Sequence, residues 1–347
     1  MPSFATCTVT EVLSSRVGLQ RVLLDDGARA FVLTDLIGDV AVGDQVVVNT
    51  TGVELGLGSG GWHVVHWNLS RRAWGTPGPG HVMKLRYTSL QADTGAGEEV
   101  HGEVPDDLGG MPVVVGTVHS QVPGVAATVK HLWPEGRVAY VMTDGAALPL
   151  AYSDLVHDLR GQGLLDGTVT VGHAFGGDVE ALNVPAALAL ARHTLRADIT
   201  VVAMGPGVVG TGTRLGTTAL EAAPALDAAA ALGGQPVLCA RVSTDDSRHR
   251  HQGVSHHSRT VLDLVRSPVD VALPADVAAA LGDQPRHRVS VIEPPDVGRL
   301  LADHGLRVTT MGRGAEREPG FFAACGAAGV RAVELVKRSS GSGLSNP

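Results

Sequence analysis

The chain has 347 residues, of which 44% are hydrophobic and 18% charged, and its formal net charge is −8. This length accommodates two domains, because domains usually hold about 100 to 200 residues. A surface that binds nucleic acid needs many Lys and Arg side chains, so the acidic balance argues against a nucleic-acid partner.

The cysteines and the apolar runs indicate the cellular compartment. Cys7, Cys239 and Cys325 are too few and too scattered for a disulfide framework or a paired-cysteine metal site, so we expect reduced thiols. The N-terminus lacks the basic region and apolar run of a signal peptide. Apolar stretches such as residues 199–204 have the length of a strand, well short of the roughly 20 residues that span a membrane. We therefore expect a cytoplasmic protein without a membrane partner.

Short β-branched runs separated by turns predict a β-rich, barrel-like module over residues 1–74. The expected strands are residues 6–12, 20–24, 30–33, 45–49 and 62–68. Small barrels often bind nucleic acid, but residues 1–70 hold three arginines against seven acidic residues, a net charge of −4. Arg71 and Arg72 raise this charge only to −2. We expect a structural or partner-contact module that does not bind DNA or RNA.

The remainder of the chain predicts a linker followed by an α/β domain. Residues 75–110 are rich in Pro, Gly and acidic residues, which favours a loop region with one strand at 83–90. Residues 111–337 alternate apolar strands with helices, which predicts a mainly parallel sheet flanked by helices. The expected strands are 113–118, 138–143, 168–171, 199–204, 237–242 and 289–292, and the expected helices are 151–160, 179–194, 218–232, 256–265, 296–304 and 318–336. Residues 338–347 predict a disordered tail.

A glycine-rich segment follows the expected strand at 199–204. Its candidate ligand-binding residues are Gly205, Gly207, Gly210, Thr211 and Thr213. The glycines have GxGxxG spacing, but Pro206 interrupts the motif and no acidic residue ends a second strand about 20 residues later, which argues against a dinucleotide fingerprint. We favour an anion-binding loop, in which backbone N–H groups and the next helix N-terminus contact the anion, over a plain tight turn.

A dense Arg and His cluster follows the expected strand at 237–242. We predict Arg248, Arg250 and Ser255 as ligand-binding residues, because Arg offers a planar fork for phosphate or carboxylate. The predicted catalytic residues are Asp246, His251, His256 and His257, because His exchanges protons near neutral pH. The alternative is a solvated loop in which Ser255 caps the following helix.

A third polar segment, residues 172–178, also lies between an expected strand and an expected helix. His173 and Asp178 are candidate ligand-binding residues, with helix capping as an equal alternative for Asp178. His119 and Asp144 follow strands as well, but a turn or capping role is favoured for each. Because the carboxyl ends of parallel strands share one edge, we expect residues 172–178, 205–213 and 246–257 to meet in one concave site.

Three motifs together resemble the bacterial domain-of-unknown-function family 3866. They are GHAFGGD at 172–178, GPGVVGTGT at 205–213 and RxRHQGVSHH at 248–257. The resemblance covers nearly the whole chain and implies that the barrel and the α/β part act as one architectural unit. It carries over no activity and no catalytic residue.

The residues favour an enzyme that acts on a small anionic metabolite, either phosphorylated or carboxylated. A non-catalytic metabolite-sensing or partner-binding module is the alternative, and a scaffold without a small ligand is a third. The cofactor stays unknown. His and Asp suit zinc, manganese or iron, but no HExxH or other fixed ligand spacing is present, so a divalent metal is left open. Homo-oligomerisation and the strand order of the sheet are left open as well.

Overall fold

The structure, a computed structural model, describes residues 1–145 and 149–341. The chain divides into two compact units, Met1–Gly95 and Ala96–Pro347. We call them the barrel unit and the α/β unit, and each is described by itself. The segment predicted as a linker, residues 75–110, spans the boundary between them.

Five strands close into a barrel in the order β1-β2-β3-β5-β4. They are β1 (Phe4–Arg16), β2 (Leu19–Leu24), β3 (Arg29–Val32), β4 (Gln45–Asn49) and β5 (Trp62–Asn68). In β4, alternate residues face the interior: Val46 and Val48 are fully buried, while Val47 between them is partly exposed. The closed barrel confirms the predicted β module. Two single-turn helices, α1 (Thr34–Ile37) and α2 (Thr51–Glu54), lie in its connections.

The segment after the barrel contains less strand than its sequence predicts. The strand expected at 83–90 is reduced to β6 (Met83–Lys84), which pairs with β7 (Ala92–Asp93). Leu85 and Tyr87 adopt φ values of 53° and 62°, and such left-handed residues cannot continue a strand. In the α/β unit, α3 (Gly97–His101) forms a short helix within the segment predicted as loop.

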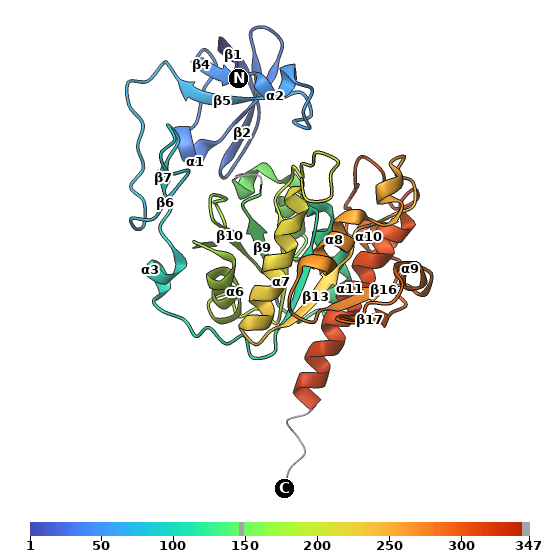
Figure 1. Cartoon of the computed structure of the whole chain (residues 1–347). Helices are drawn as coiled ribbons and strands as arrows, with labels where there is room; N and C mark the ends of the chain where they lie inside the picture. The colour runs from blue at the N-terminus through green and yellow to red at the C-terminus, as the bar shows by residue number, and fades with distance from the viewer. Residues whose placement is uncertain (146–148, 342–347) are drawn as a thin grey trace. The chain divides into compact units, whose positions relative to one another are not determined.

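A parallel sheet forms the centre of the α/β unit (Figure 1). It has eight strands in the order β11-β10-β9-β12-β8-β13-β16-β17. The strands are β8 (Pro112–Gly116), β9 (Val138–Thr143), β10 (Gly167–Val171), β11 (Val179–Ala181), β12 (Ile199–Met204), β13 (Gln235–Cys239), β16 (Asp270–Leu273) and β17 (Arg288–Val291). All neighbouring strands of this sheet are parallel. The central strands are buried along their whole length, which explains their continuous apolar sequences.

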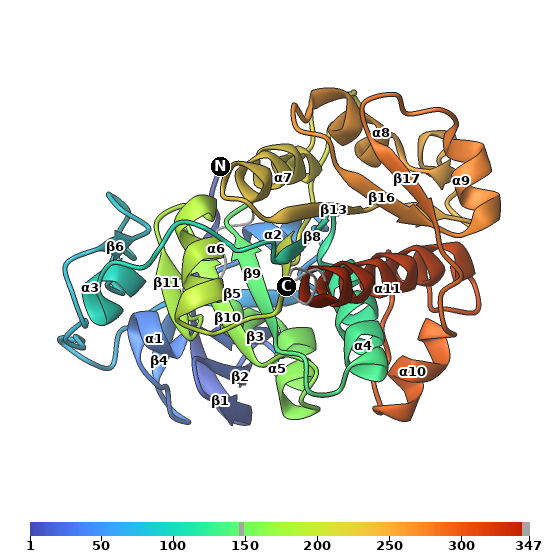
Figure 2. The same ribbon diagram turned by 90° about the horizontal axis from the view of Figure 1, so that it is seen from below.

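Helices cover both faces of this sheet (Figure 2). One face packs against α6 (Val184–His193), α7 (Ala222–Ala231), α8 (His256–Leu264) and α9 (Ala275–Leu281), and the other against α4 (Val122–Leu132), α5 (Asp154–Gly161), α10 (Val297–Asp303) and α11 (Pro319–Gly341). Successive residues of a strand point to opposite faces of the sheet. In β8, Val113 and Val115 pack against the first helix layer and Val114 packs against the second. This arrangement confirms the predicted fold class.

Two features differ from the helices that the sequence predicts. The helix expected at 179–194 starts later, because its first residues form the edge strand β11 and Asn183 Oδ1 caps α6 by accepting the amide of Ala186. The sequence did not predict α4, α9 or β16 as separate elements.

The last helix, α11, continues to Gly341, beyond residue 336, and the rest of the predicted disordered tail, residues 342–347, lies outside the described residues. By length and composition alone, its segment Pro319–Arg338 would suffice to cross a membrane, unlike the shorter apolar runs noted in the sequence. However, 67% of the most apolar 18-residue stretch of this helix is buried inside the unit, where the helix packs against α4 and the sheet. A buried core helix can have the same length and apolar composition as a membrane-spanning helix.

Candidate functional site

The topology of the sheet creates a crevice at its carboxyl edge. The chain leaves β8 toward α4 on one face, whereas it leaves the neighbouring β13 toward α8 on the other. Where adjacent parallel strands send their connections to opposite faces, the carboxyl ends leave room for a ligand. The loops after β12 and β13 lie at this position.

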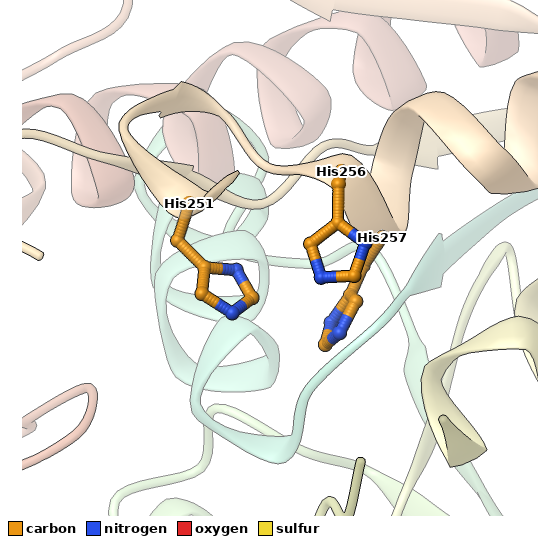
Figure 3. Close-up of side chains that lie close together, drawn as sticks. All are labelled: His251, His256 and His257. Atoms are coloured by element: carbon orange, nitrogen blue, oxygen red, sulfur yellow. The ribbon is translucent and has the colours of Figure 1, made fainter. Parts of the chain in front are cut away.

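Two of the three predicted loops line one small pocket, which we call the Arg–His pocket, with a volume of about 70 Å³. The glycine-rich loop contributes Gly210, Gly212 and Thr213, and the segment after β13 contributes Arg241, Arg248, Arg250, His251, His256 and His257. Figure 3 shows the three imidazoles close together, with ring centroids 4.4–4.9 Å apart. Met311, from the loop after α10, also lines the pocket.

Asp246 is a buried counter-ion for the arginines. Its carboxylate accepts two hydrogen bonds from the guanidinium of Arg248, at 2.9 Å from Nε and 2.7 Å from Nη2. Arg313 Nη2 and Arg241 Nη2 lie 3.4 and 3.8 Å from Oδ2. The hydrogen bonds from Arg248 hold the pKa of Asp246 well below its usual range. The carboxylate stays charged at neutral pH and positions the arginines, which speaks against the proton-handling role predicted for Asp246.

A second buried carboxylate, Glu318, supports the same cluster from the start of α11. It accepts hydrogen bonds from Ser243 Oγ at 2.7 Å, from the Thr244 amide at 2.8 Å and from Arg313 Nε at 2.6 Å. Burial alone raises the pKa of Glu318, but these hydrogen bonds outweigh it and the net shift is downward. No local pattern relates Glu318 and Arg313 to the Arg–His segment, so neither residue was predicted from the sequence.

The three histidines of the pocket are uncharged at neutral pH. Burial, with Arg241 nearby, lowers the pKa of His251 to about 4 and that of His257 to about 3. Burial and then Arg250 lower the pKa of His256. The positive charge of the pocket therefore comes from its arginines, and the imidazoles keep one lone pair each.

Hydrogen bonds fix two of these rings. His251 Nδ1 lies 2.8 Å from Ser255 Oγ, which also accepts the amide of His257 at 3.3 Å and so caps α8. Arg241 Nη1 lies 3.5 Å from His257 Nδ1. Ser255 is fully buried and does not line the pocket, so its helix-capping alternative is the one that the structure shows.

The arginines outnumber their acidic partners. Arg248 and Arg313 are paired with Asp246 and Glu318, and Arg241 shares Asp246 at a longer distance. Arg250, at the exposed rim, forms no ion pair within the described residues. The cluster therefore carries excess positive charge next to the pocket.

The glycine-rich loop is longer than the motif that suggested it. A bridge between Gly210 and Thr217 closes it, with the Thr211 amide donating to the Gly216 carbonyl at 2.7 Å. A single 3-10 turn, Thr218–Glu221, then precedes α7. Among the predicted residues, Gly210 and Thr213 line the pocket, whereas Gly205, Gly207 and Thr211 do not.

The third loop, residues 172–178, does not line the Arg–His pocket, contrary to the prediction that all three loops meet. It turns back along β10, so that Asp178 Oδ2 accepts the amide of Thr168 at 2.9 Å and Oδ1 pairs with Arg160 at 2.7 Å. The His173 amide donates to Asp144 Oδ2 at 3.1 Å. Three strands, β9, β12 and β8, separate β10 from β13.

His119 is a half-buried residue whose ring is held by hydrogen bonds on both nitrogens. Its Nδ1 lies 3.1 Å from the Tyr140 hydroxyl and its Nε2 lies 2.8 Å from Ser153 Oγ. The Tyr140 hydroxyl donates to the backbone carbonyls at the end of β12, so it accepts the proton of Nδ1 and leaves Nε2 to accept from Ser153. Burial lowers the pKa of His119 to about 4. The neutral ring ties β8, β9 and the start of α5 together.

Two groups in the described residues bring potential metal ligands together. One ring nitrogen each of His251, His256 and His257 lies within 4.8 Å of the others, and a second group in the barrel unit combines Cys7, Asp25 and Asp26. Both aspartates of the barrel group are exposed, and exposed acidic groups commonly occur without a metal. The histidine group is the stronger candidate, because it is largely enclosed.

Comparison with protein families identifies the family of the chain. No curated protein matches the chain. One family model matches residues 29–329, which include most of the barrel strands, the entire parallel sheet and the Arg–His pocket. The chain therefore belongs to the family described as "Protein of unknown function (DUF3866)".

Proposed function

We propose that the Arg–His pocket binds the phosphate or carboxylate group of a small anionic metabolite. The observation that carries this proposal is the charge of the pocket: Arg241, Arg248 and Arg250 line it, and Arg250 has no acidic partner in the described chain. Concentrated positive charge in a concave site attracts anions even when the whole protein is acidic, as at a net charge of −8.

The glycine-rich loop suits the same ligand. Gly212 has φ +84°, and a Cβ there would lie 3.7 Å from Arg250 Nη2, so a side chain at this position would occupy the space beside the guanidinium. The bare backbone leaves that space to a ligand, and Thr213 and Thr217 line the same pocket. Hydroxyl and guanidinium donors together match the oxygens of phosphate or carboxylate.

His256 favours an enzyme over a sensor that only binds. Its Nε2 atom is buried without a hydrogen-bond partner among the described residues, while its ring remains partly exposed in the pocket. A neutral imidazole next to a bound anion can accept a proton from it, as general base catalysis requires. The metabolite sensor stays the alternative, and the cytoplasmic location and the absence of nucleic-acid and membrane partners stay predictions.

Thermal unfolding in phosphate tests the anion site. At a phosphate concentration ten times the Kd, mass action stabilises the folded state by about 1.4 kcal/mol. This raises the Tm of a domain of this size by about 3–5 °C. Arg250→Gln should remove most of the rise, and Arg288→Gln should keep it, because Arg288 is exposed on β17 and does not line the pocket.

The comparison with chloride at equal ionic strength separates a specific site from general screening. We expect chloride to reproduce only a small part of the rise. An equal rise in chloride, or an unchanged phosphate response in Arg250→Gln, would refute the anion site.

A further inference from the structure

Three imidazoles from one short segment converge in the Arg–His pocket. His256 and His257 begin α8, and His251 ends the 3-10 turn His249–His251. A small hairpin, β14 (Val242–Ser243) paired with β15 (Gly253–Val254), holds the two ends of the segment 244–252 together. His251 lies in this segment, and His256 and His257 follow shortly after β15. One ring nitrogen of each residue lies within 4.8 Å of the others (Figure 3).

The surroundings of two rings resemble those of metal-binding imidazoles. Such ligands usually hold one ring nitrogen in a hydrogen bond, which orients the other toward the metal. Ser255 Oγ, 2.8 Å from His251 Nδ1, provides that contact and leaves Nε2 free to coordinate. His256 Nε2 is buried and has no partner in the described chain, and a buried polar atom without a partner requires an explanation.

We propose that His251, His256 and His257 bind one divalent transition-metal ion, with Zn²⁺ as the best match. Imidazole nitrogens suit zinc and its neighbours, and three histidines with an open fourth position are a known zinc arrangement. All three residues line the pocket, so the open position faces the ligand space. In this respect the inference rests on the proposed anion site, because the metal would contact the same anion. A metal-bound His256 Nε2 no longer has the lone pair that accepts a proton, so the general-base role of His256 applies to the metal-free pocket only.

The nearby arginines affect the affinity of this site for a metal ion. Arg241 Nη1 lies 3.5 Å from His257 Nδ1, at the outer limit of a hydrogen bond, so a metal–nitrogen bond can replace the contact. Like charge from Arg241 and Arg250 weakens binding of the bare cation. A bound anion offsets this repulsion, so phosphate and metal should strengthen each other's binding by the same factor.

A Co²⁺ titration of the untagged full-length chain tests the proposal. Co²⁺ replaces Zn²⁺ and gives strong visible absorption when it is tetrahedral. We expect one equivalent to bind, with affinity reduced about tenfold or more in His256→Ala and in His251→Gln. His249→Ala is the matched control, because His249 is exposed in the same turn and lies outside the group. It should bind within about twofold of the wild type, since it removes no ligand.

The two proposals fail in different ways. Absence of Co²⁺ binding with and without phosphate, or equal binding by the wild type and both ligand variants, overturns the metal site. A phosphate-specific rise in Tm would then still support the anion pocket. Conversely, Arg250→Gln should keep Co²⁺ binding in the absence of phosphate and lose the enhancement by phosphate. Circular dichroism of each variant verifies that it is folded.

Discussion

The loops after β13 and β10 begin alike and end differently. Both follow buried parallel strands and both carry His and Asp residues. After β13 the chain continues outward through the β14–β15 hairpin to α8, and this course holds the Arg and His side chains beside the crevice. After β10 the chain turns back and pairs as β11. The direction of the chain beyond the strand therefore decides whether polar residues build a site.

The two aspartates of these loops show the same contrast. The side chain of Asp246 is 2% exposed and serves several arginines, whereas that of Asp178 is 33% exposed and pairs with one, Arg160. Asp246 compensates charges that the fold has removed from water, and Asp178 mainly holds the returning loop against β10. The same residue type thus organises a charged site in one loop and a turn in the other.

The largest expected effect comes from removing these carboxylates. Asp246→Ala leaves Arg241 buried and without its nearest negative charge, so we expect a loss of about 3–5 kcal/mol in the free energy of unfolding. Asp178→Ala removes an exposed ion pair and the hydrogen bonds to Thr168, with an expected loss of about 1–2 kcal/mol. Urea denaturation at pH 7.5 measures both. Equal losses would contradict the counter-ion role of Asp246.

His119 extends the comparison to a third strand end and predicts a pH effect. Its pKa is about 4 in the folded state, against the ordinary histidine pKa of 6.5. The unfolded chain therefore binds the proton more readily, so this contribution to stability is complete above pH 6.5 and is lost as the pH falls toward 4. The slope is about 1.4 kcal/mol per pH unit.

His119→Gln checks this contribution. At pH 7.5 we expect the variant to be less stable than the wild type by about 1–3 kcal/mol, because the hydrogen bonds of the ring to Tyr140 and Ser153 are lost. At pH 5.0 the difference should narrow by about 2 kcal/mol, because only the wild type loses stability through this ring. Urea denaturation at both pH values gives the difference, and parallel pH dependence of the two proteins would show that His119 is not held neutral.

A smaller effect should distinguish glycines in the two loops. A Cβ at Gly177 would lie 2.9 Å from the Thr170 amide nitrogen and 3.1 Å from the Val179 carbonyl oxygen, so Gly177→Ala must displace the returning loop. We expect it to cost about 1–3 kcal/mol. At Gly212 a Cβ would make no such close contact. The expected loss of about 1 kcal/mol for Gly212→Ala comes from the positive φ of this position alone. Thermal unfolding ranks the two, and the reverse order would contradict the tight return along β10.

Much of the fold was predictable because buried strands and helices place apolar residues in regular patterns along the sequence. The barrel strands β2 to β5 and the strands β8, β9, β10 and β12 are short β-branched runs bounded by turns, and all were predicted close to their observed bounds. The first barrel strand, β1, is longer than predicted, Phe4–Arg16 against residues 6–12. The helix α4 was missed because its residues from Val122 to Val129 are all buried, so no polar stripe marks it as a helix. The strand β16 was missed because it has four residues and begins with the buried, ion-paired Asp270.

By itself, the sequence determined the two-part organisation, the α/β class and the segment that carries the Arg and His residues, because these depend on local composition and periodicity. Only the tertiary structure decided that residues 172–178 turn away from the pocket and that Arg313 and Glu318 join Asp246 from elsewhere in the chain. Those contacts link residues about 70 positions apart, since Arg313 and Asp246 differ by 67 positions and Glu318 and Ser243 by 75. Pairing over such distances depends on how strands are ordered and where helices pack, and no local pattern records that.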